Sequence, residues 1–543
     1  MKSFDVVILG GTPSGVSAAV TASKQGLKVA LLSQGPFFGG AISNGLVATD
    51  IGQVLAISGY PKEFFKLFQP MYGKNPEWRL EPKVAEEMFN SELVKAHIST
   101  ERYVSVKSVG VSANQINSLT TNSGERYCGR VFIDATYTGD LLALAGIKYH
   151  LNYSDLSAYG ETQTRKPRLK LIADMTDENA SDSAKAFADN PYIKSFQQMP
   201  PLKTILNAGM PSMTYRLCVT KVDSNKVSFA KGPNYEKWAP SWKLYMKYFF
   251  NQARPATMSI EPNGTILTRL WQIAKIPNNK YDLNSGRSSF TNVPVPSEYY
   301  SDPSKRLEIN KQLAEYLQDF LYFVQNEDSV PNVEQVAIRD FGLCKDEFVD
   351  NHNFPYEPYV RAGQRLIGVA NLTATDVITN REKVDSVAIG SYRLDMKPGL
   401  LIYSNNQLFQ DWSAFFRAPV YEIPFGTMLP KQGVGNLITS VSISASPLAY
   451  SSLRMEVQFM ALGQVAGIAS ALAIKENKQL AESMYGSVQT ELRKVGAIYK
   501  IRETCKLMSK HVKLAQYFDA ATCVPHAVVH KSGKPRDLKL NRF

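Results

Sequence analysis

The fold class is decided near the start of the chain, by the stretch Val6-Val7-Ile8-Leu9-Gly10-Gly11-Thr12-Pro13-Ser14-Gly15. Its four leading apolar residues predict a short strand that is buried on both faces, as in a parallel sheet. The small residues at 16–25 predict a helix that ends at Gly26, and residues 27–32 predict the next strand. A strand, a glycine-rich turn, a helix and a strand in this order indicate one half of a Rossmann-type fold, which is an α/β architecture.

The turn between the first strand and the helix predicts a binding site for a diphosphate. A helix N-terminus offers unpaired N–H groups and a partial positive charge, which suit the two phosphate charges. Gly10 allows the tight turn and Gly15 allows the helix to pack closely on the strand, whereas Thr12 stands where the usual fingerprint has its middle glycine. The predicted cofactor-binding residues of this turn are Gly10, Gly11, Thr12, Pro13, Ser14 and Gly15.

The end of the second strand differs from the usual dinucleotide site. An acidic residue usually binds the adenosine ribose there, but this sequence has Ser33-Gln34, which we expect to make single hydrogen bonds. No arginine stands beside them, which argues against a 2′-phosphate and hence against NADP. The glycines that follow, Gly39, Gly40 and Gly45, predict a loop that passes along the cofactor, and a flexible loop is the alternative.

Length and composition set the wider limits. A chain of 543 residues with 44% hydrophobic and 20% charged residues predicts a globular protein of two domains. The sequence shows no run of eighteen apolar residues and no signal peptide, so we expect no membrane span and a cytoplasmic protein. The five cysteines are scattered without metal-binding spacing, so we expect free thiols and no metal site, with a Cys505–Cys523 redox pair as the alternative.

Positive charge is concentrated near the C-terminus. The net charge is +12, and residues 499–543 hold ten Lys and Arg against three Asp and Glu, which contributes +7. We expect a solvated basic extension, and an acidic partner or an acidic membrane surface is the alternative. Aromatic residues that could stack on bases are sparse there, so we do not expect a nucleic acid partner.

Several motifs occur in the order found in one known family. They are the turn at 10–15, Gly39-Gly40, Phe132-Ile133-Asp134-Ala135-Thr136-Tyr137-Thr138-Gly139-Asp140-Leu141, the segment 342–348 and the segment 462–467. Over residues 4–498 the chain resembles the bacterial FAD-dependent oxidoreductases of the glutathione-reductase-like fold, whose members often carry the label xanthan lyase. The resemblance implies FAD as the cofactor and a small organic substrate, with an electron acceptor that the sequence does not identify.

The resemblance also implies a domain organisation. A discontinuous Rossmann-type FAD-binding domain comprises residues 1–150 and a returning segment 397–498, and an inserted mixed α+β substrate or cap domain comprises 151–396. The basic extension 499–543 lies outside the resemblance. A helix that begins near Ser451 is expected to direct its N-terminus at the flavin ring. The further cofactor-binding positions that the resemblance implies are Asp134, Ala135, Thr136, Ser444, Leu462 and Gly463.

Three histidines of the family pattern are replaced in this chain. Their positions hold Lys83, Lys397 and Pro447. The last two are expected to lie near the flavin, and a proline can neither transfer a proton nor donate a hydrogen bond. Either other groups move the proton, or the reaction differs, or catalysis is lost.

The candidate catalytic residues are Arg361, Arg454 and Tyr392. The arginines can bind an anionic substrate or the negative end of the flavin, and structural ion pairs are the alternative. Tyr392 can act as an acid or a hydrogen-bond donor, and a packed aromatic ring is the alternative. We therefore expect an oxidoreductase that moves a hydride between flavin and substrate, and a flavin-binding scaffold or biosynthetic partner without catalysis is the alternative.

Overall fold

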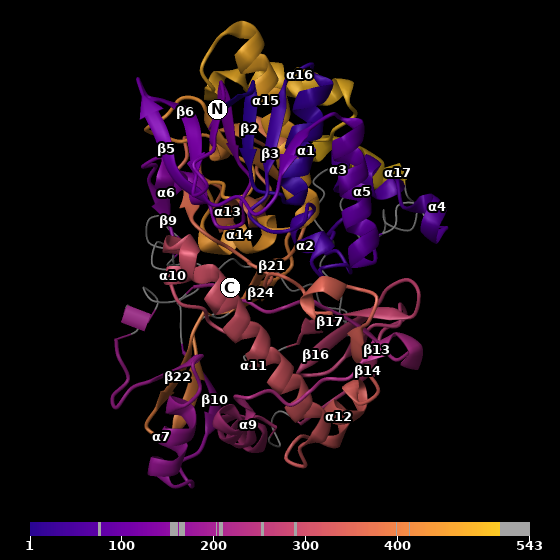
Figure 1. The fold of residues 1–543 in the computed structure, drawn as a ribbon, viewed down its shortest axis with the longest axis vertical. Helices are drawn as coiled ribbons and strands as arrows, with labels where there is room; N and C mark the ends of the chain where they lie inside the picture. The colour runs from indigo at the N-terminus through magenta and orange to yellow at the C-terminus, as the bar shows by residue number, and fades with distance from the viewer. Residues whose placement is uncertain are drawn as a thin grey trace, which may run out of the picture.

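The computed structural model shows two layers stacked along the long axis of the molecule (Figure 1). Helices α1 (Pro13–Lys24) and α15 (Glu456–Glu476) lie in the upper layer, and α9 (Tyr235–Phe249) and α11 (Arg306–Asn326) lie in the lower layer. The structure describes residues 1–73, 78–151, 161, 169–201, 204–205, 210–250, 255–286, 290–397, 399–411 and 413–510. Most of the predicted basic extension, from residue 511, therefore lies outside the described residues.

A parallel sheet forms the centre of the upper layer. Its strands are β2 (Val6–Leu9), β3 (Val29–Leu32), β4 (Ser99–Glu101), β8 (Val131–Asp134) and β26 (Leu437–Thr439), in the order β26-β8-β2-β3-β4. Val6 is in register with Val29 on one side and with Val131 on the other. Every residue of β2, β3 and β8 is buried, which explains the unbroken apolar runs in the sequence.

Helices α1 and α15 pack directly against each other in this layer. A Cβ at Gly463 of α15 would overlap the Ser14 carbonyl oxygen, so only glycine allows this approach. The Ser17 hydroxyl donates to the Met460 carbonyl at 2.7 Å, across a sequence separation of 443 residues. The upper domain is therefore discontinuous, because a late segment of the chain returns to complete the domain that the first segment begins.

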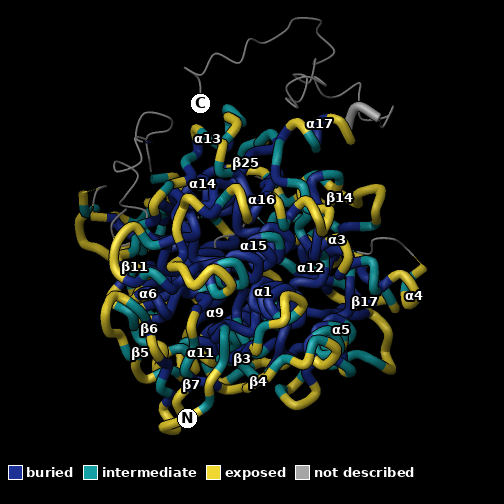
Figure 2. Tube along the Cα trace, turned by 90° about the horizontal axis from the view of Figure 1, so that it is seen from above, coloured by how far each residue is buried: buried dark blue, intermediate teal, exposed yellow. Residues whose placement is uncertain are grey.

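Helix α15 is long and apolar enough to cross a membrane by length and composition alone. However, 83% of its apolar window is buried inside the protein. Figure 2 shows α15 in the dark blue, buried interior above α1. Packing in the core accounts for the apolar composition of this helix without a membrane.

Smaller elements surround the parallel sheet. A second sheet has the order β1-β7-β6-β5, and two-stranded pairs are formed by β9 with β19, β20 with β25 and β21 with β24. These strands are β1 (Lys2–Ser3), β5 (Val106–Ser112), β6 (Gln115–Thr121), β7 (Arg126–Cys128), β9 (Tyr149–His150), β19 (Arg365–Leu366), β20 (Ser386–Gly390), β21 (Leu394–Met396), β24 (Ala414–Phe416) and β25 (Tyr421–Pro424). The helices are α2 (Gly40–Ser43), α3 (Gly59–Lys66), α4 (Gln69–Tyr72), α5 (Pro82–Lys95), α6 (Asp140–Leu144), α13 (Ala374–Thr379), α14 (Pro447–Leu453), α16 (Tyr485–Lys494) and α17 (Ile501–Lys510).

The lower layer is a mixed α+β cap with two sheets. The larger sheet has the order β13-β18-β12-β17-β16-β15-β14, and the smaller has the order β10-β23-β22-β11. The strands are β10 (Lys170–Asp174), β11 (Ile193–Ser195), β12 (Leu217–Thr220), β13 (Lys226–Val227), β14 (Ser259–Ile260), β15 (Ile266–Leu267), β16 (Trp271–Lys275), β17 (Lys280–Ser285), β18 (Gly342–Cys344), β22 (Leu401–Ser404) and β23 (Gln407–Gln410). The other helices are α7 (Ala180–Ala188), α10 (Glu298–Ser301) and α12 (Asn332–Ile338).

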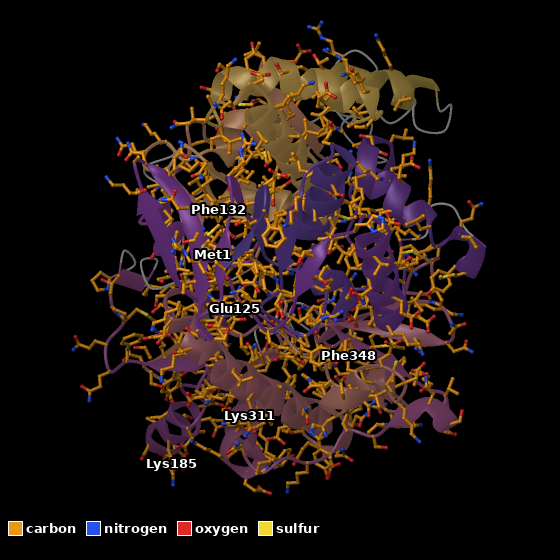
Figure 3. The ribbon with its side chains drawn as sticks, turned by 45° about the horizontal axis from the view of Figure 1, so that its top comes forward. Met1, Glu125, Phe132, Lys185, Lys311 and Phe348 are labelled. Carbon is orange, nitrogen blue, oxygen red and sulfur yellow. The ribbon has the colours of Figure 1, made fainter. Side chains whose placement is uncertain are left out.

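Aromatic side chains fill the core of the cap. The ring of Trp242 in α9 lies 5.3 Å from the rings of Tyr316 and Phe320 in α11, measured between centroids. The two layers thus have separate hydrophobic cores. Figure 3 labels Phe132 in the sheet of the upper layer and Lys311 on α11 in the cap.

The chain crosses between the two layers on both sides of the predicted boundary at residue 397. Before it, β20 and β21 already pack in the core of the upper layer. Strands β22 and β23 fall inside the predicted returning segment, but they pair with β10 and β11 of the cap. Strand β26 then joins the parallel sheet beside β8. Short strands show in the sequence which residues are buried, but not which sheet the strand joins, so the sequence does not show this alternation between the layers.

The cysteines differ in oxidation state. Cys128, Cys218 and Cys344 are free thiols, as expected from their spacing. Cys505 in α17 is disulfide-bonded, so the expectation of a free thiol is wrong for this residue.

Candidate functional site

The turn between β2 and α1 is held by Thr12, the residue that replaces the middle glycine of the usual fingerprint. Its hydroxyl oxygen accepts from the Gly15 N–H at 3.1 Å, and its hydroxyl donates to the Ala135 carbonyl at 2.8 Å. Gly10 has a φ of +117°, and a Cβ there would lie 2.5 Å from the Ala135 carbonyl carbon. The first turn of α1 begins with Pro13 and contains no acidic residue, so its free N–H groups can serve an anion.

A second glycine segment closes over this turn. The N–H groups of Gly39 and Gly40 donate to the Gly11 carbonyl oxygen at 2.7 and 3.2 Å. Gly40 begins α2, and the Ala41 N–H of this helix donates to Tyr137 Oη at 2.9 Å. The structure thus brings the two glycine segments into contact, beside an aromatic hydroxyl that sequence reasoning did not assign.

Side chains from distant segments meet at the end of β3. The Ser33 hydroxyl donates to the Phe37 carbonyl at 2.8 Å, and Gln34 Nε2 donates to Asp140 at 2.5 Å. The Arg306 guanidinium makes a bidentate pair with the Asp140 carboxylate, with N···O distances of 2.6 and 2.8 Å. Burial acts to raise the pKa of Asp140, but Arg306 outweighs it and the pKa lies below the usual value. Asp140 therefore brings a carboxylate to the end of this strand, where it is paired with Arg306.

The loop after β8 is shaped by Asp134. Its carboxylate accepts from the Thr136 N–H and hydroxyl at 2.9 and 2.7 Å, and from the Leu141 N–H at 2.9 Å. Burial, and then the nearby Asp140, raise the pKa of Asp134 to about 7. These bonds fold the segment from Ala135 onward, so in this structure Asp134 positions Asp140. Asp140 was missed as a site residue, although it lies within a motif on which the family resemblance rests.

The remaining predicted cofactor-binding positions have varied surroundings. The Ser444 hydroxyl donates to Asn371, in the buried segment between β26 and α14. Leu462 and Gly463 lie in the middle of α15, where both pack into the core. Gly45 has a φ of +102°, a conformation that favours glycine.

The helix predicted to begin near Ser451 is in fact two helices. Helix α14 begins at Pro447, the position of a family histidine, and α15 begins at Glu456. Proline suits the first position of a helix because the N–H it lacks would be unpaired there. The break falls at Arg454-Met455, and the Arg454 side chain lines the cavity described next.

A small cavity lies where the upper layer meets the cap. Its volume is about 10 Å³, which is room for about one water molecule. Two positions of family histidines, Lys397 and Pro447, line this same cavity, although they are far apart in the sequence. The charged side chains that line it are Arg361, Arg365, Arg454, Lys397 and Asp395.

The two predicted arginines meet at the ring of Tyr359. The guanidinium carbons of Arg361 and Arg454 lie 5.3 and 5.7 Å from the centroid of that ring. Arg454 also donates to Tyr359 Oη at 2.7 Å and lies 3.5 Å from the Asp395 carboxylate. Burial, and then the like charge of Arg454, lower the pKa of Arg361 to about 10. Positive charge is therefore held at close range in a buried site.

Lys397 pairs with Asp395 beside the cavity, at an Nζ–Oδ1 distance of 3.5 Å. Burial lowers the pKa of Lys397, although Asp395 opposes this shift. Burial acts to raise the pKa of Asp395, but Lys397 and Arg454 outweigh it and the pKa lies below the usual value. A lysine with a lowered pKa gives up its proton more readily than an exposed lysine does, so Lys397 is a candidate for the proton transfer of the histidine it replaces.

Tyr392 lies beside the cavity without lining it. The Arg393 guanidinium carbon lies 5.5 Å from the centroid of its ring, and its carbonyl accepts from the Ser452 hydroxyl at 2.5 Å. Burial raises the pKa of Tyr392 well above the usual value, so the hydroxyl stays protonated. The structure therefore brings Arg361 and Arg454 together and leaves Tyr392 outside the lining.

Glu456 of α15 pairs with Tyr137, which lies in the loop between β8 and α6. Tyr137 Oη donates to Glu456 Oε1 at 2.8 Å, and the other oxygen of Glu456 has no partner among the residues that the structure describes. Burial raises the pKa of Glu456 to about 8, so this carboxyl group holds a proton at neutral pH.

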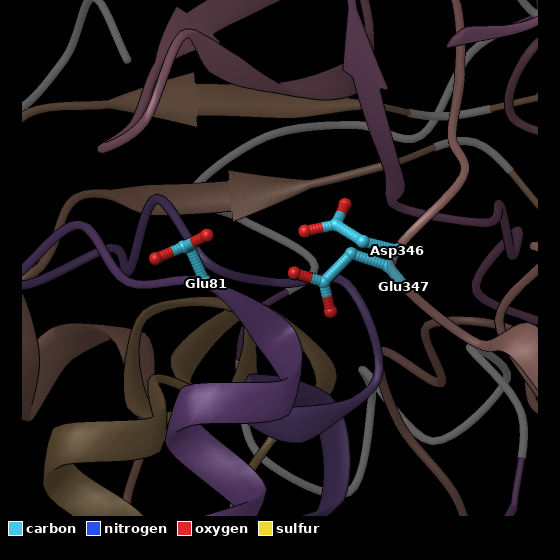
Figure 4. A group of neighbouring side chains, drawn as sticks. All are labelled: Glu81, Asp346 and Glu347. Atoms are coloured by element: carbon cyan, nitrogen blue, oxygen red, sulfur yellow. The ribbon is translucent and has the colours of Figure 1, made fainter. Parts of the chain in front are cut away.

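A group of three carboxylates outside the cavity is held by a lysine. Figure 4 shows Glu81 at the start of α5, and Asp346 and Glu347 on the loop after β18. Lys280 Nζ lies 2.8, 2.7 and 2.6 Å from carboxylate oxygens of these three residues, where a metal ion would otherwise be needed to offset their charge. Lys83, the third position of a family histidine, pairs with Asp346 at 2.8 Å and so lies in this group instead of at the cavity.

A parallel sheet with a glycine-rich turn, a returning helix and an inserted cap defines an α/β dinucleotide-binding protein. Residues 5–492 match the model of the family described as FAD dependent oxidoreductase. The chain belongs to this family, so it is an FAD-dependent oxidoreductase and its cofactor is FAD. The match confirms the predicted family, fold class and cofactor, and it gives no support to the label xanthan lyase.

Solved flavoprotein structures resemble the chain more distantly. A geranylgeranyl bacteriochlorophyll reductase-like protein from Thermoplasma acidophilum is 10% identical, over 93% of this chain and 87% of its own, with a TM-score of 0.37. The flavin-dependent brominase Bmp2 is 11% identical, over 91% of this chain and 86% of its own, with a TM-score of 0.34. At these TM-scores the two structures carry no argument about this chain.

The residues of the upper layer fit the diphosphate of FAD. The N-terminus of α1 presents backbone N–H groups without an acidic side chain. Buried polar atoms without a partner among the described residues, Ser43 Oγ, Gln364 Oε1 and Glu456 Oε2, can bond a polar ligand.

Proposed function

We propose that the protein transfers a hydride between FAD and a small organic substrate that binds at the cavity lined by Arg361, Arg454 and Lys397. The observation that carries this proposal is the position of the cavity. Its walls come from the cap, as at Pro211, and from the FAD-binding layer, as at Pro447 at the start of α14. Hydride transfer needs substrate and flavin on adjoining surfaces from which water is excluded.

The side chains around the cavity have separate roles in this proposal. Bound FAD supplies the two-electron chemistry. Arg454, which is held by Tyr359 and Asp395, orients the substrate. Lys397 exchanges a proton with the substrate in place of the family histidine, and the lowered pKa that burial gives it suits this task. Asp395 holds the Lys397 ammonium near the cavity.

Anaerobic reduction of the bound flavin tests the proposal. The purified holoprotein is mixed with polyols, amino acids and carboxylates, and the loss of flavin absorbance is followed. We expect bleaching by one class, and a rate lowered about 100-fold in Lys397→Met with unchanged FAD stoichiometry. Lys431→Met, at an exposed lysine, is the matched control and should bleach at the normal rate. Bleaching at the same rate in Lys397→Met would remove the proton-transfer role of Lys397.

A flavin-binding scaffold without catalysis is the second candidate function. It is favoured by Pro447, because proline cannot exchange a proton at a position where the family pattern has histidine. Stoichiometric FAD that no substrate class bleaches, in the native chain and in Pro447→His alike, would support the scaffold. Bleaching that appears only in Pro447→His would show that the native chain lacks activity because proline replaces this histidine.

A further inference from the structure

Positive charge is in excess around the cavity between the two layers. Among the residues that the structure describes, four cationic side chains line it against one carboxylate, that of Asp395. Arg361, Arg365 and Arg454 are each at most 5% exposed. An unbalanced charge in a low-dielectric interior is costly unless an opposite charge lies nearby. The arrangement therefore favours a bound anion.

Arg361 is oriented without being neutralised. Its guanidinium donates to the Ser212 carbonyl at 2.5 Å, to Asn292 Oδ1 at 2.6 Å and to Ser285 Oγ at 3.5 Å. All three partners are uncharged groups of the cap. Because the cap holds this guanidinium, Arg361 belongs to the cap side of the cavity, opposite the side formed by the FAD-binding layer. This placement favours a contact with the substrate over a contact with the flavin.

The acidic side chains near the cavity act on its other cations, and Arg361 forms no ion pair with an acidic side chain among the described residues. Asp395 is shared between two of the cations, at 3.5 Å from each. Glu456 holds a proton at neutral pH, because burial raises its pKa to about 8. Asp50 and Glu161 attract the arginines from outside the lining of the cavity. A ligand that brings its own negative charge would complete the site.

We propose that this cavity binds a carboxylate of the substrate, so that the substrate class is a small carboxylic acid. This inference rests on the proposed function, because it names the substrate of the same site. A guanidinium matches a planar carboxylate with two parallel hydrogen bonds.

Matched carboxylate and amide ligands test the inference. Holoprotein is titrated with propionate and propionamide, and with benzoate and benzamide, and binding is followed by the flavin absorbance shift and by the melting temperature. We expect the acids to bind and the amides not to bind. Arg361→Met should weaken acid binding by about 30-fold or more, and Arg361→Lys should restore part of it. Arg381→Met, at an exposed arginine, is the control and should bind normally.

Several outcomes would overturn the inference. They are equal binding of acid and amide, unchanged acid binding in both Arg361 variants, and tighter binding of inorganic phosphate than of any acid. A changed flavin spectrum in Arg361→Lys with unchanged acid binding would assign the arginine to the flavin instead. Bleaching by a polyol without acid binding would sink this inference and leave the proposed function standing. Acid binding without bleaching by any substrate class would support this inference and contradict the proposed function.

Discussion

The two ends of the functional site are built from different parts of the chain. At the diphosphate end the donors are backbone N–H groups. They are held by the glycines at 10–15 and 39–40 and by Thr12, whose side chain caps the N-terminus of α1. At the cavity end the groups are charged side chains, among them Arg361 and Lys397. A site made of backbone tolerates a changed side chain, as Thr12 shows, whereas a site made of side chains changes its chemistry with each replacement. The departures from the family pattern at Lys397 and Pro447 fall at the second end.

The largest effect is expected from crowding the backbone end. A Cβ at Gly15 would overlap the Gly10 carbonyl oxygen, so Gly15→Val should destabilise the fold by about 4 kcal/mol and abolish FAD binding. Chemical denaturation and FAD titration measure both effects. Gly486→Ala in α16 is the control, because its Cβ meets no neighbour. This variant should raise the free energy of unfolding by about 0.5 kcal/mol. Normal FAD affinity in Gly15→Val would refute a site built on this turn.

The next largest effect concerns charges that join the layers. Lys280→Met leaves three buried or half-buried carboxylates without their cation and should cost about 4 kcal/mol in free energy of unfolding at pH 7. Burial acts to raise the pKa of Asp346, but Lys280 and Lys83 outweigh it, so the stabilisation is present above about pH 4 and is lost as the pH falls. Lys83→Met removes a half-exposed pair and should cost about 0.5 kcal/mol. Equal losses in the two variants would contradict this difference.

A third prediction concerns the pair between Arg306 and Asp140. Arg306→Met leaves a buried carboxylate unpaired and should lower the free energy of unfolding by about 3 kcal/mol. The pKa of Asp140 is lowered by Arg306 against the effect of burial, so the loss should shrink as the pH falls below about 4. Denaturation at pH 7 and pH 3.5 measures this, with Lys305→Met, at an exposed lysine, as the control. A loss that does not depend on pH would mean that Arg306 acts by packing alone.

The smallest effect is expected from Glu456. Burial raises its folded pKa to about 8, above an unfolded value of about 4.3, so the folded protein binds the extra proton. Stability should therefore fall by about 2 kcal/mol between pH 6 and pH 9 on account of this residue, and Glu456→Gln should remove that fall. Melting temperatures across this range test it. Glu476→Gln, at the exposed end of the same helix, should keep the native pH profile.

The sequence by itself determined the nucleotide-binding half. The strand at 6–9, the turn at 10–15 and the helix after it are set by adjacent residues, whose apolar runs, glycines and small side chains act locally. The family resemblance added FAD and the inserted cap. Residue type suggested Arg361 and Arg454 as candidate catalytic residues, and only the structure shows that both line one cavity.

Only the tertiary structure decided the rest. It shows that Lys397 and Pro447 line one cavity and that Lys83 lies in the carboxylate group around Lys280. It also shows that Asp140 contacts Gln34. It also joined β22 and β23 to the cap. The physical reason is that each of these contacts joins segments far apart in the chain, so it depends on how whole layers pack and which charges they bury together. No local pattern of residues contains that information.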